Sequence, residues 1–214
     1  MSSKAGPAGA PRLFVIAAPS GAGKTTLVHA LVTKKPELRF SISYTTRPKR
    51  RNEAYGVDYL FVDREEFERL RSAGEMLESA EVFDNLYGTS RRQVEEHLAD
   101  GRGVILEIDW QGARQVRKAM PEAVSIFIMP PSVAELERRL RTRGTDTPAV
   151  VERRLKDALA DMRHWHEFDH VIINDDLEDA VARVLAIVDG EGGATSTADP
   201  GLKAAVAAIL GPDP

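Results

Sequence analysis

The chain contains no cysteine among its 214 residues, which excludes a disulfide framework and thiol-based catalysis. No apolar run approaches the roughly 18 residues that a membrane-spanning helix needs. Positive charge is not in excess either, because 29 lysines and arginines stand against 33 aspartates and glutamates, a formal net charge of -4. This balance argues against a surface that binds nucleic acid. The expected partners are small molecules.

What the sequence does contain is enough apolar residues, 43% of the chain, for the core of one domain. Residues 1–11 are rich in Gly, Ala and Pro and lack the apolar stretch of a signal peptide, so we expect a flexible arm and a cytoplasmic protein. Residues 190–214 predict a flexible linker and a short alanine-rich helix from Leu202 to Leu210, marginal when isolated. Truncation after Asp189 is therefore expected to change stability little.

The most informative segment is 18–25, Ala-Pro-Ser-Gly-Ala-Gly-Lys-Thr, which lies between a strand-like apolar run at 13–17 and an amphipathic helix. It follows the phosphate-loop pattern G-x-x-x-x-G-K-[ST], except that Ala18 replaces the first glycine. Its glycines let backbone N–H groups surround a phosphate, Lys24 adds positive charge, and Thr25 offers a hydroxyl to Mg²⁺. A nucleoside triphosphate is the predicted ligand. The residues expected to hold it are Ala18, Pro19, Ser20, Gly21, Ala22, Gly23, Lys24, Thr25 and Thr26.

Short apolar runs recur at 13–17, 104–108, 125–129 and 171–173. Continuous runs of this length are typical of strands buried on both faces of a parallel sheet. Helix signals lie between them. Ser132 and Glu135 form a capping box for a helix to about residue 141, and Thr147 with Pro148 predicts a second helix start. The fold class is therefore α/β.

Residues 38–90 interrupt this alternation. They predict strands at 40–44, 59–62 and 76–83 and one short helix at 63–72, which indicates a small mixed lobe inserted into the core. The lobe carries a basic run at 47–51 together with tyrosines, and guanidinium and phenol groups can hold a phosphate dianion. A second phosphorylated substrate is expected there.

Further motifs identify a known family. They are Ser43-Tyr44-Thr45-Thr46-Arg47, Glu78, Tyr87-Gly88-Thr89, Glu107-Ile108-Asp109-Trp110-Gln111-Gly112 and Val171-Ile172-Ile173-Asn174-Asp175-Asp176. With these motifs the chain resembles the guanylate kinases, which make ADP and GDP from ATP and GMP. The resemblance runs from about Arg12 to Asp189. It departs at Glu107, where the family usually has aspartate, and this leaves the role of Glu107 open.

The resemblance implies a P-loop kinase with a parallel β-sheet core at 12–37 and 101–189, a GMP-binding lobe at 38–100 and a helical lid at about 139–156. The residues that it implies for the GMP phosphate are Arg47, Arg50, Tyr59 and Tyr87. Those implied for guanine are Ser43, Glu78, Thr89 and Asp109. Lid arginines Arg139, Arg143 and Arg154 would join Lys24 and Arg47 as catalytic residues that neutralise the transferring group, and Asn174 would lie at the ATP site.

The chemistry of guanine agrees with this implication. Its N1–H and exocyclic amine are adjacent donors that one carboxylate accepts as a pair, and its O6 takes a hydroxyl proton. The GMP phosphate has a second pKa near 6, so it is mostly a dianion at neutral pH and needs no general base. Mg²⁺ is expected on the ATP phosphates with Thr25. His164 and His166 are two residues apart, so they do not share a helix face, and they predict packing or surface placement and not a metal site.

Three other functions share part of the pattern. The D-x-x-G at 109–112 also fits GTPases, but Asn174-Asp175-Asp176 lacks the lysine of their base-reading motif. A scaffold module without turnover would be expected to have lost Lys24 or the lid arginines. A kinase of phosphorylated ribose would keep the ATP loop without a base-reading carboxylate, and it stays the second candidate. The predicted partners are ATP and GMP or dGMP, with no nucleic acid or membrane, and a homo-oligomer stays open.

Overall fold

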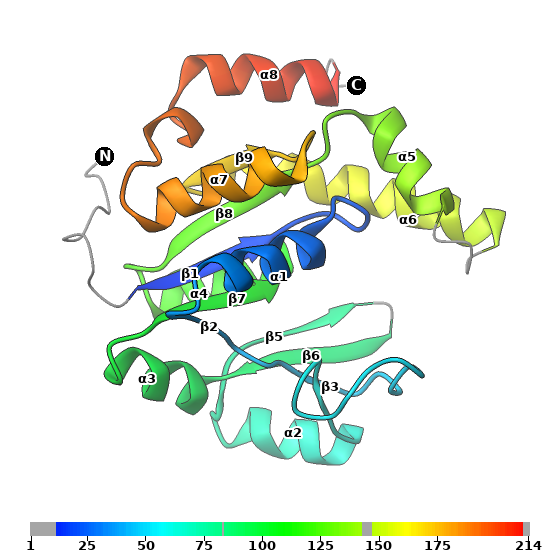
Figure 1. The fold of residues 1–214 in the computed structure, drawn as a ribbon. Helices are drawn as coiled ribbons and strands as arrows, with labels where there is room; N and C mark the ends of the chain where they lie inside the picture. The colour runs from blue at the N-terminus through cyan, green and yellow to red at the C-terminus, as the bar shows by residue number, and fades with distance from the viewer. Residues whose placement is uncertain (1–11, 83, 143–146, 212–214) are drawn as a thin grey trace.

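The computed structural model describes residues 12–82, 84–142 and 147–211. Its larger sheet has five parallel strands in the order β2-β7-β1-β8-β9 (Figure 1). They are β1 (Leu13–Ala17), β2 (Leu38–Phe40), β7 (Gly103–Ile108), β8 (Val124–Met129) and β9 (His170–Ile173). Four of these five were predicted from the apolar runs. The prediction of an α/β fold with a parallel core is confirmed.

Helices cover both faces of this sheet, because its side chains alternate between two apolar clusters. In β1, Val15 points into one cluster and Ile16 into the other, and both are fully buried. The second cluster is covered by α1 (Lys24–Lys34) and α7 (Leu177–Val188). The first is covered by α3 (Arg91–Ala99), α4 (Trp110–Ala119), α5 (Val133–Thr142), α6 (Pro148–Met162) and α8 (Pro200–Leu210). A short 3-10 helix, η1 (Arg163–Glu167), follows α6.

The smaller sheet lies within residues 44–90 and has the order β4-β3-β6-β5. Its strands are β3 (Tyr44–Thr45), β4 (Leu60–Phe61), β5 (Met76–Val82) and β6 (Asn85–Ser90), and α2 (Arg64–Ser72) packs on it. The strand predicted at 40–44 is wrong in extent: Phe40 ends β2 in the core sheet, and Tyr44 begins β3. Sequence reasoning missed β6, which contains Gly88 and mostly polar neighbours.

The C-terminal segment contains the helix predicted at Leu202–Leu210, as α8, but it packs against the core, which differs from the expectation that its removal would change stability little. After η2 (Gly193–Thr195), the hydroxyl of Thr197 donates to the carbonyl of Phe168 at 2.7 Å. In α8, Val206 is fully buried in the first apolar cluster, and Leu202, Ile209 and Leu210 pack against the same cluster. Figure 1 shows α8 beside the β9 edge of the sheet. This segment is part of the folded domain.

Candidate active site

The phosphate loop joins β1 to α1 at the carboxyl edge of the core sheet. Gly21 and Gly23 have φ angles of +92° and +90°, which side-chain-bearing residues rarely adopt. Gly23 is also the N-cap of α1, so the loop ends at a helix N-terminus that favours anions. Lys24 Nζ donates to the carbonyl of Ile108 at 2.7 Å, at the end of β7. The loop therefore has the backbone conformation and the charge of a phosphate cradle.

A cleft of about 480 Å³ extends from this loop to the smaller sheet. It brings together residues that are distant in sequence. The predicted site residues that line it are Ala18, Pro19, Ser20, Gly21, Gly23, Lys24, Thr25, Thr26, Ser43, Arg50, Tyr59, Glu78, Tyr87, Asp109 and Arg154. Both predicted substrate sites therefore face one space.

Five predicted site residues, Ala22, Arg47, Thr89, Arg139 and Asn174, are not among the residues that line this cleft. Arg143 lies outside the described residues. The side chain of Thr89 is fully buried, and Asn174 is 5% exposed.

Glu78 is a buried carboxylate at the floor of the cleft, 4% exposed. Thr89 Oγ1 donates to its Oε1 at 2.7 Å from the neighbouring strand. The pairing of β5 with β6 shifts register between Met76 and Glu78, and such irregularities re-aim side chains next to functional sites. Burial raises the pKa of Glu78 to about 7, and the nearby charge of Asp109 adds to this effect.

The N-terminus of α4 closes over Glu78. Asp109 caps this helix by accepting from the N–H of Gly112 at 2.7 Å. A Cβ atom at position 112 would lie 2.4 Å from Glu78 Oε2, so only glycine permits this approach. Gln115 exchanges two hydrogen bonds with the backbone of Ser79, at 2.7 and 3.1 Å. These contacts fix the core against the smaller sheet at the carboxylate.

Arg47 lies beside the cleft and is held by Glu53, a residue that sequence reasoning missed. Its two terminal nitrogens donate to the two carboxylate oxygens of Glu53 at 2.6 and 3.1 Å. Glu53 also accepts from the N–H of Arg50 at 2.7 Å. The only signal in the sequence for this role of Glu53 was its spacing after the basic run. The guanidinium lies 5.4 Å from the ring of Tyr59. Burial raises the pKa of Tyr59 to about 12, so it stays a neutral donor.

Glu107 joins the site through Thr25, whose Oγ1 donates to Glu107 Oε1 at 2.5 Å. Both residues line the cleft at the carboxyl edge of the core sheet. Oxygen donors of this kind suit Mg²⁺. Within the described residues, no group of three His, Asp or Glu side chains forms a protein-only metal site.

Helix α6 contributes side chains that contact the phosphate loop and the start of α4. Arg154 Nη2 donates to Ser20 Oγ at 2.8 Å. Asp161, which sequence reasoning missed, accepts from Trp110 Nε1 at 2.9 Å, and burial raises its pKa to about 6. His164 stacks on Trp110 with ring centroids 3.6 Å apart, which agrees with the predicted packing role.

None of the described helices is long and apolar enough to cross a membrane.

Comparisons with known proteins cover nearly the whole chain. A family model described as guanylate kinase matches residues 10–191. The guanylate kinase of Methylococcus capsulatus is 51% identical over 199 residues, which are 93% of this chain and 98% of that protein. The guanylate kinase of Dechloromonas aromatica is 54% identical over 183 residues, 86% of this chain and 91% of that protein.

A solved structure gives the same result for the fold. The crystal structure of guanylate kinase from Anaplasma phagocytophilum aligns with a TM-score of 0.71 at 36% identity, covering 96% of this chain and 98% of that one. The family match includes both sheets, the phosphate loop and the carboxylate between them. The chain therefore belongs to the guanylate kinase family.

Proposed function

We propose that this cleft binds ATP on the phosphate loop and GMP or dGMP against the smaller sheet, and transfers the γ-phosphoryl group between them. The products are ADP and GDP or dGDP. The observation that carries the proposal is the position of Glu78, a buried carboxylate in the same cleft as Lys24. A kinase of phosphorylated ribose would have no base for this carboxylate to accept from.

Guanine is the base that fits this arrangement. A carboxylate at Glu78 accepts from N1–H and the exocyclic amine together, whereas adenine would present an acceptor nitrogen to it. Ser43 lines the cleft and offers a hydroxyl proton for O6. Thr89 supports the carboxylate with its own hydroxyl, and Asp109 lies beside the proposed base site at the start of α4.

The GMP phosphate is the proposed nucleophile. Arg50, Tyr59 and Tyr87 line the cleft as donors, and Arg47 is held by Glu53 next to Tyr59. One oxygen of the phosphate dianion forms a bond to the γ-phosphorus of ATP while the bond to the β,γ-bridging oxygen breaks, and ADP leaves with that oxygen. The dianion carries no proton to remove, so no general base is required.

Positive charge around the transferring group stabilises the transition state. Lys24 supplies it from the loop, and Arg154 supplies it from α6, in the segment of about 139–156 that we propose as a lid. We also propose that Thr25 holds Mg²⁺ together with the ATP phosphates, with Glu107 as its hydrogen-bond acceptor. The ion would neutralise phosphate charge as it develops.

An assay of ADP release with GMP, dGMP and AMP as acceptors tests this function. We expect AMP to react on the order of 10⁴ less efficiently in kcat/KM, because it leaves a buried carboxylate facing an acceptor. Glu78→Gln should cut GMP turnover steeply without changing ATP affinity, whereas Glu65→Gln, an exposed substitution on α2 that does not line the cleft, should have little effect. Comparable phosphorylation of AMP and GMP by the unmodified chain would contradict the proposal.

We propose the cytoplasm as the location of this activity, because its nucleotide substrates are made and used there. The acidic net charge of -4 supports small nucleotides as partners and disfavours nucleic acid.

A further inference from the structure

The indole ring of Trp110 links the first turn of α4 to the last turn of α6. Its Nε1 donates to Asp161 Oδ1 at 2.9 Å. The imidazole ring of His164, just beyond α6, stacks on the indole with centroids 3.6 Å apart and an interplanar angle of 14°. Trp110 and Asp161 both line the cleft. Two helices that are distant in the sequence therefore meet at one aromatic ring on the cleft wall.

A second, more exposed set of contacts joins the same elements. Arg114, one turn after Trp110, donates through Nε and Nη2 to the two carboxylate oxygens of Glu167 at 2.7 and 2.6 Å. Its guanidinium lies 4.7 Å from the centre of the Trp110 ring. Glu167 also pairs with His164 Nδ1 at 2.7 Å. Together with Asp161, these side chains form one connected group, which we call the α4–α6 cluster.

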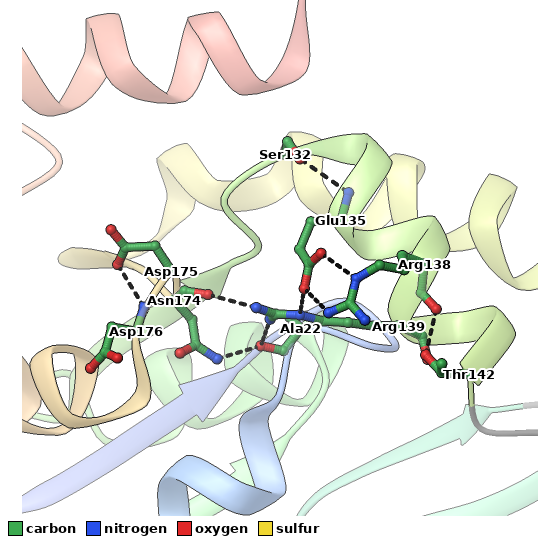
Figure 2. Close-up of polar contacts among 9 residues, drawn as sticks. All are labelled: Ala22, Ser132, Glu135, Arg138, Arg139, Thr142, Asn174, Asp175 and Asp176. Atoms are coloured by element: carbon green, nitrogen blue, oxygen red, sulfur yellow. Dashed lines mark hydrogen bonds and ion pairs between the residues drawn. The ribbon is translucent and has the colours of Figure 1, made fainter.

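Helix α5, which precedes α6, is held at a different place. Arg139 donates to the carbonyl of Asn174 at 3.1 Å and makes a longer contact of 3.4 Å with the carbonyl of Ala22 in the phosphate loop (Figure 2). Helix α6 instead reaches the loop through Arg154 and is joined to α4 through Asp161. The orientation of α6 over the loop is therefore linked to α4.

Arg154 and Asp161 lie two helical turns apart on α6, and both line the cleft. This spacing corresponds to about 10 Å along the helix axis. A tilt of roughly 10° at the Asp161 end would move Arg154 by about 2 Å, because a helix moves as a stiff rod. Misplacement of a group by about 1 Å can cost on the order of 10²-fold in rate. Small changes at Asp161 can therefore have large effects at Arg154.

The contact between α4 and α6 includes a carboxylate where an apolar side chain would pack at lower cost. Burial raises the pKa of Asp161 to about 6, so its ionised form carries a desolvation penalty in this position. A hydrogen bond differs from an apolar contact because it requires a particular distance and direction. The bond between Trp110 and Asp161 therefore specifies the orientation of α6 on α4 as well as its attachment.

We propose that Trp110 and Asp161 are positioning residues for phosphoryl transfer: their hydrogen bond sets the orientation of α6 and thereby holds Arg154 over the phosphate loop. They act through Arg154 and not by touching the nucleotides. The inference rests on the proposed function, in which the charge of Arg154 stabilises the transition state.

The test is a double-mutant cycle on kcat between Asp161→Ala and Arg154→Met in the full chain. Asp161→Ala should lower kcat on the order of tenfold when Arg154 is present. In the Arg154→Met background it should lower kcat by no more than about twofold, because the group that it misplaces is already gone. A side chain that touched the substrate, or that only stabilised the fold, would lower kcat by the same factor in both backgrounds, and this result would overturn the inference.

Two further variants identify the hydrogen bond as the cause. Asp161→Asn keeps an oxygen that accepts from Trp110 Nε1, so kcat should stay within about threefold of the unmodified chain. Trp110→Phe removes the donor and keeps a ring for His164. It should lower kcat as Asp161→Ala does, and the two changes together should cost no more than either alone. A kcat for Asp161→Asn as low as that of Asp161→Ala would overturn the inference.

The matched control is Glu152→Gln, which removes an exposed carboxylate from α6 that does not line the cleft. It should turn over like the unmodified chain. Each kcat is expressed per folded protein, with the folded fraction taken from near-ultraviolet circular dichroism, so that partial unfolding of a variant is not counted as a loss of catalysis.

Failure of the proposed function gives different results. Full turnover of Arg154→Met would remove the charge of Arg154 from the mechanism and overturn the inference with it. An unmodified chain that phosphorylates AMP as well as GMP would contradict only the acceptor assignment. The cycle can be measured with either acceptor, so it decides the inference in that case as well.

Discussion

Glu78 and Thr89 are partners across two antiparallel strands, and the buried hydroxyl of Thr89 donates to the carboxylate of Glu78 at 2.7 Å. The hydrogen bond favours the ionised carboxylate, whereas burial disfavours it. Burial has the larger effect, so the pKa lies near 7 and not near its ordinary value of 4.5. The group that would read guanine therefore titrates at neutral pH.

We expect KM for GMP to rise by about tenfold as the pH falls from 8 to 6. GMP needs the ionised carboxylate, and a pKa near 7 means that this form is mostly present at pH 8 and mostly lost at pH 6. The measurement is KM for GMP against pH at saturating ATP. The GMP phosphate also titrates near pH 6, so Glu78→Gln serves as the reference that keeps only that effect. Parallel curves for the two proteins would disprove the role of Glu78.

Lys24→Met should lower kcat by on the order of 10³ or more, because the ammonium group stabilises charge that develops on the phosphates during transfer. The fold and GMP affinity should be unaffected. Lys34→Met is the control: it removes an exposed lysine from the other end of α1 that pairs with Glu178. Near-full turnover in the Lys24 variant would mean that the phosphate loop takes no part in the mechanism.

Glu107→Gln should increase the Mg²⁺ concentration that half-maximal activity requires. The carboxylate orients the Thr25 hydroxyl through a 2.5 Å hydrogen bond, and substitution of a residue that hydrogen-bonds a metal ligand typically changes metal affinity 10–100-fold. Activity is measured against free Mg²⁺ at fixed ATP and GMP. Glu122→Gln, an exposed substitution between α4 and β8, provides the baseline. An unchanged requirement for Mg²⁺ would argue that Thr25 needs no orientation by Glu107.

Removal of residues 190–214 should lower the melting temperature, contrary to the expectation from sequence, because α8 buries apolar side chains against the core. A single substitution, Val206→Ala, should cost about 2 kcal/mol and lower Tm by roughly 4–8 °C. Lys203→Ala on the exposed side of the same helix should change Tm by little. Equal melting temperatures for the two substitutions would mean that α8 contributes no stability.

The sequence predicted the strands that are buried on both faces, because a run such as 104–108 consists almost entirely of apolar residues and has few alternatives. It did not predict β6, since Gly88 and polar residues remove the apolar alternation and the strand depends on its two neighbours. Packing of α8 was also missed. An alanine-rich helix with four apolar side chains becomes stable only where the core leaves a complementary surface, which the sequence does not display.

The same distinction applies to the cleft. Residues within motifs, such as Lys24 and Glu78, were predicted because their chemistry requires a local pattern. Glu53 and Asp161 were not, because each acts by pairing with Arg47 or Trp110 across a turn or between helices. The roles of such residues are defined by their partners in the folded chain. In the sequence, they cannot be distinguished from ordinary charged residues on the surface of a helix or loop.

The hydrogen bond from Lys24 to the carbonyl of Ile108 has a consequence for affinity. Without this carbonyl, the ammonium group of Lys24 would exchange a full hydration shell for phosphate oxygens when a nucleotide binds. Here part of that shell is already replaced by a protein dipole, so arrival of the nucleotide exchanges one ordered partner for another. The fold holds the lysine in place before the nucleotide binds, and the carbonyl already offsets part of its desolvation cost. Less of the binding free energy is therefore consumed in ordering it.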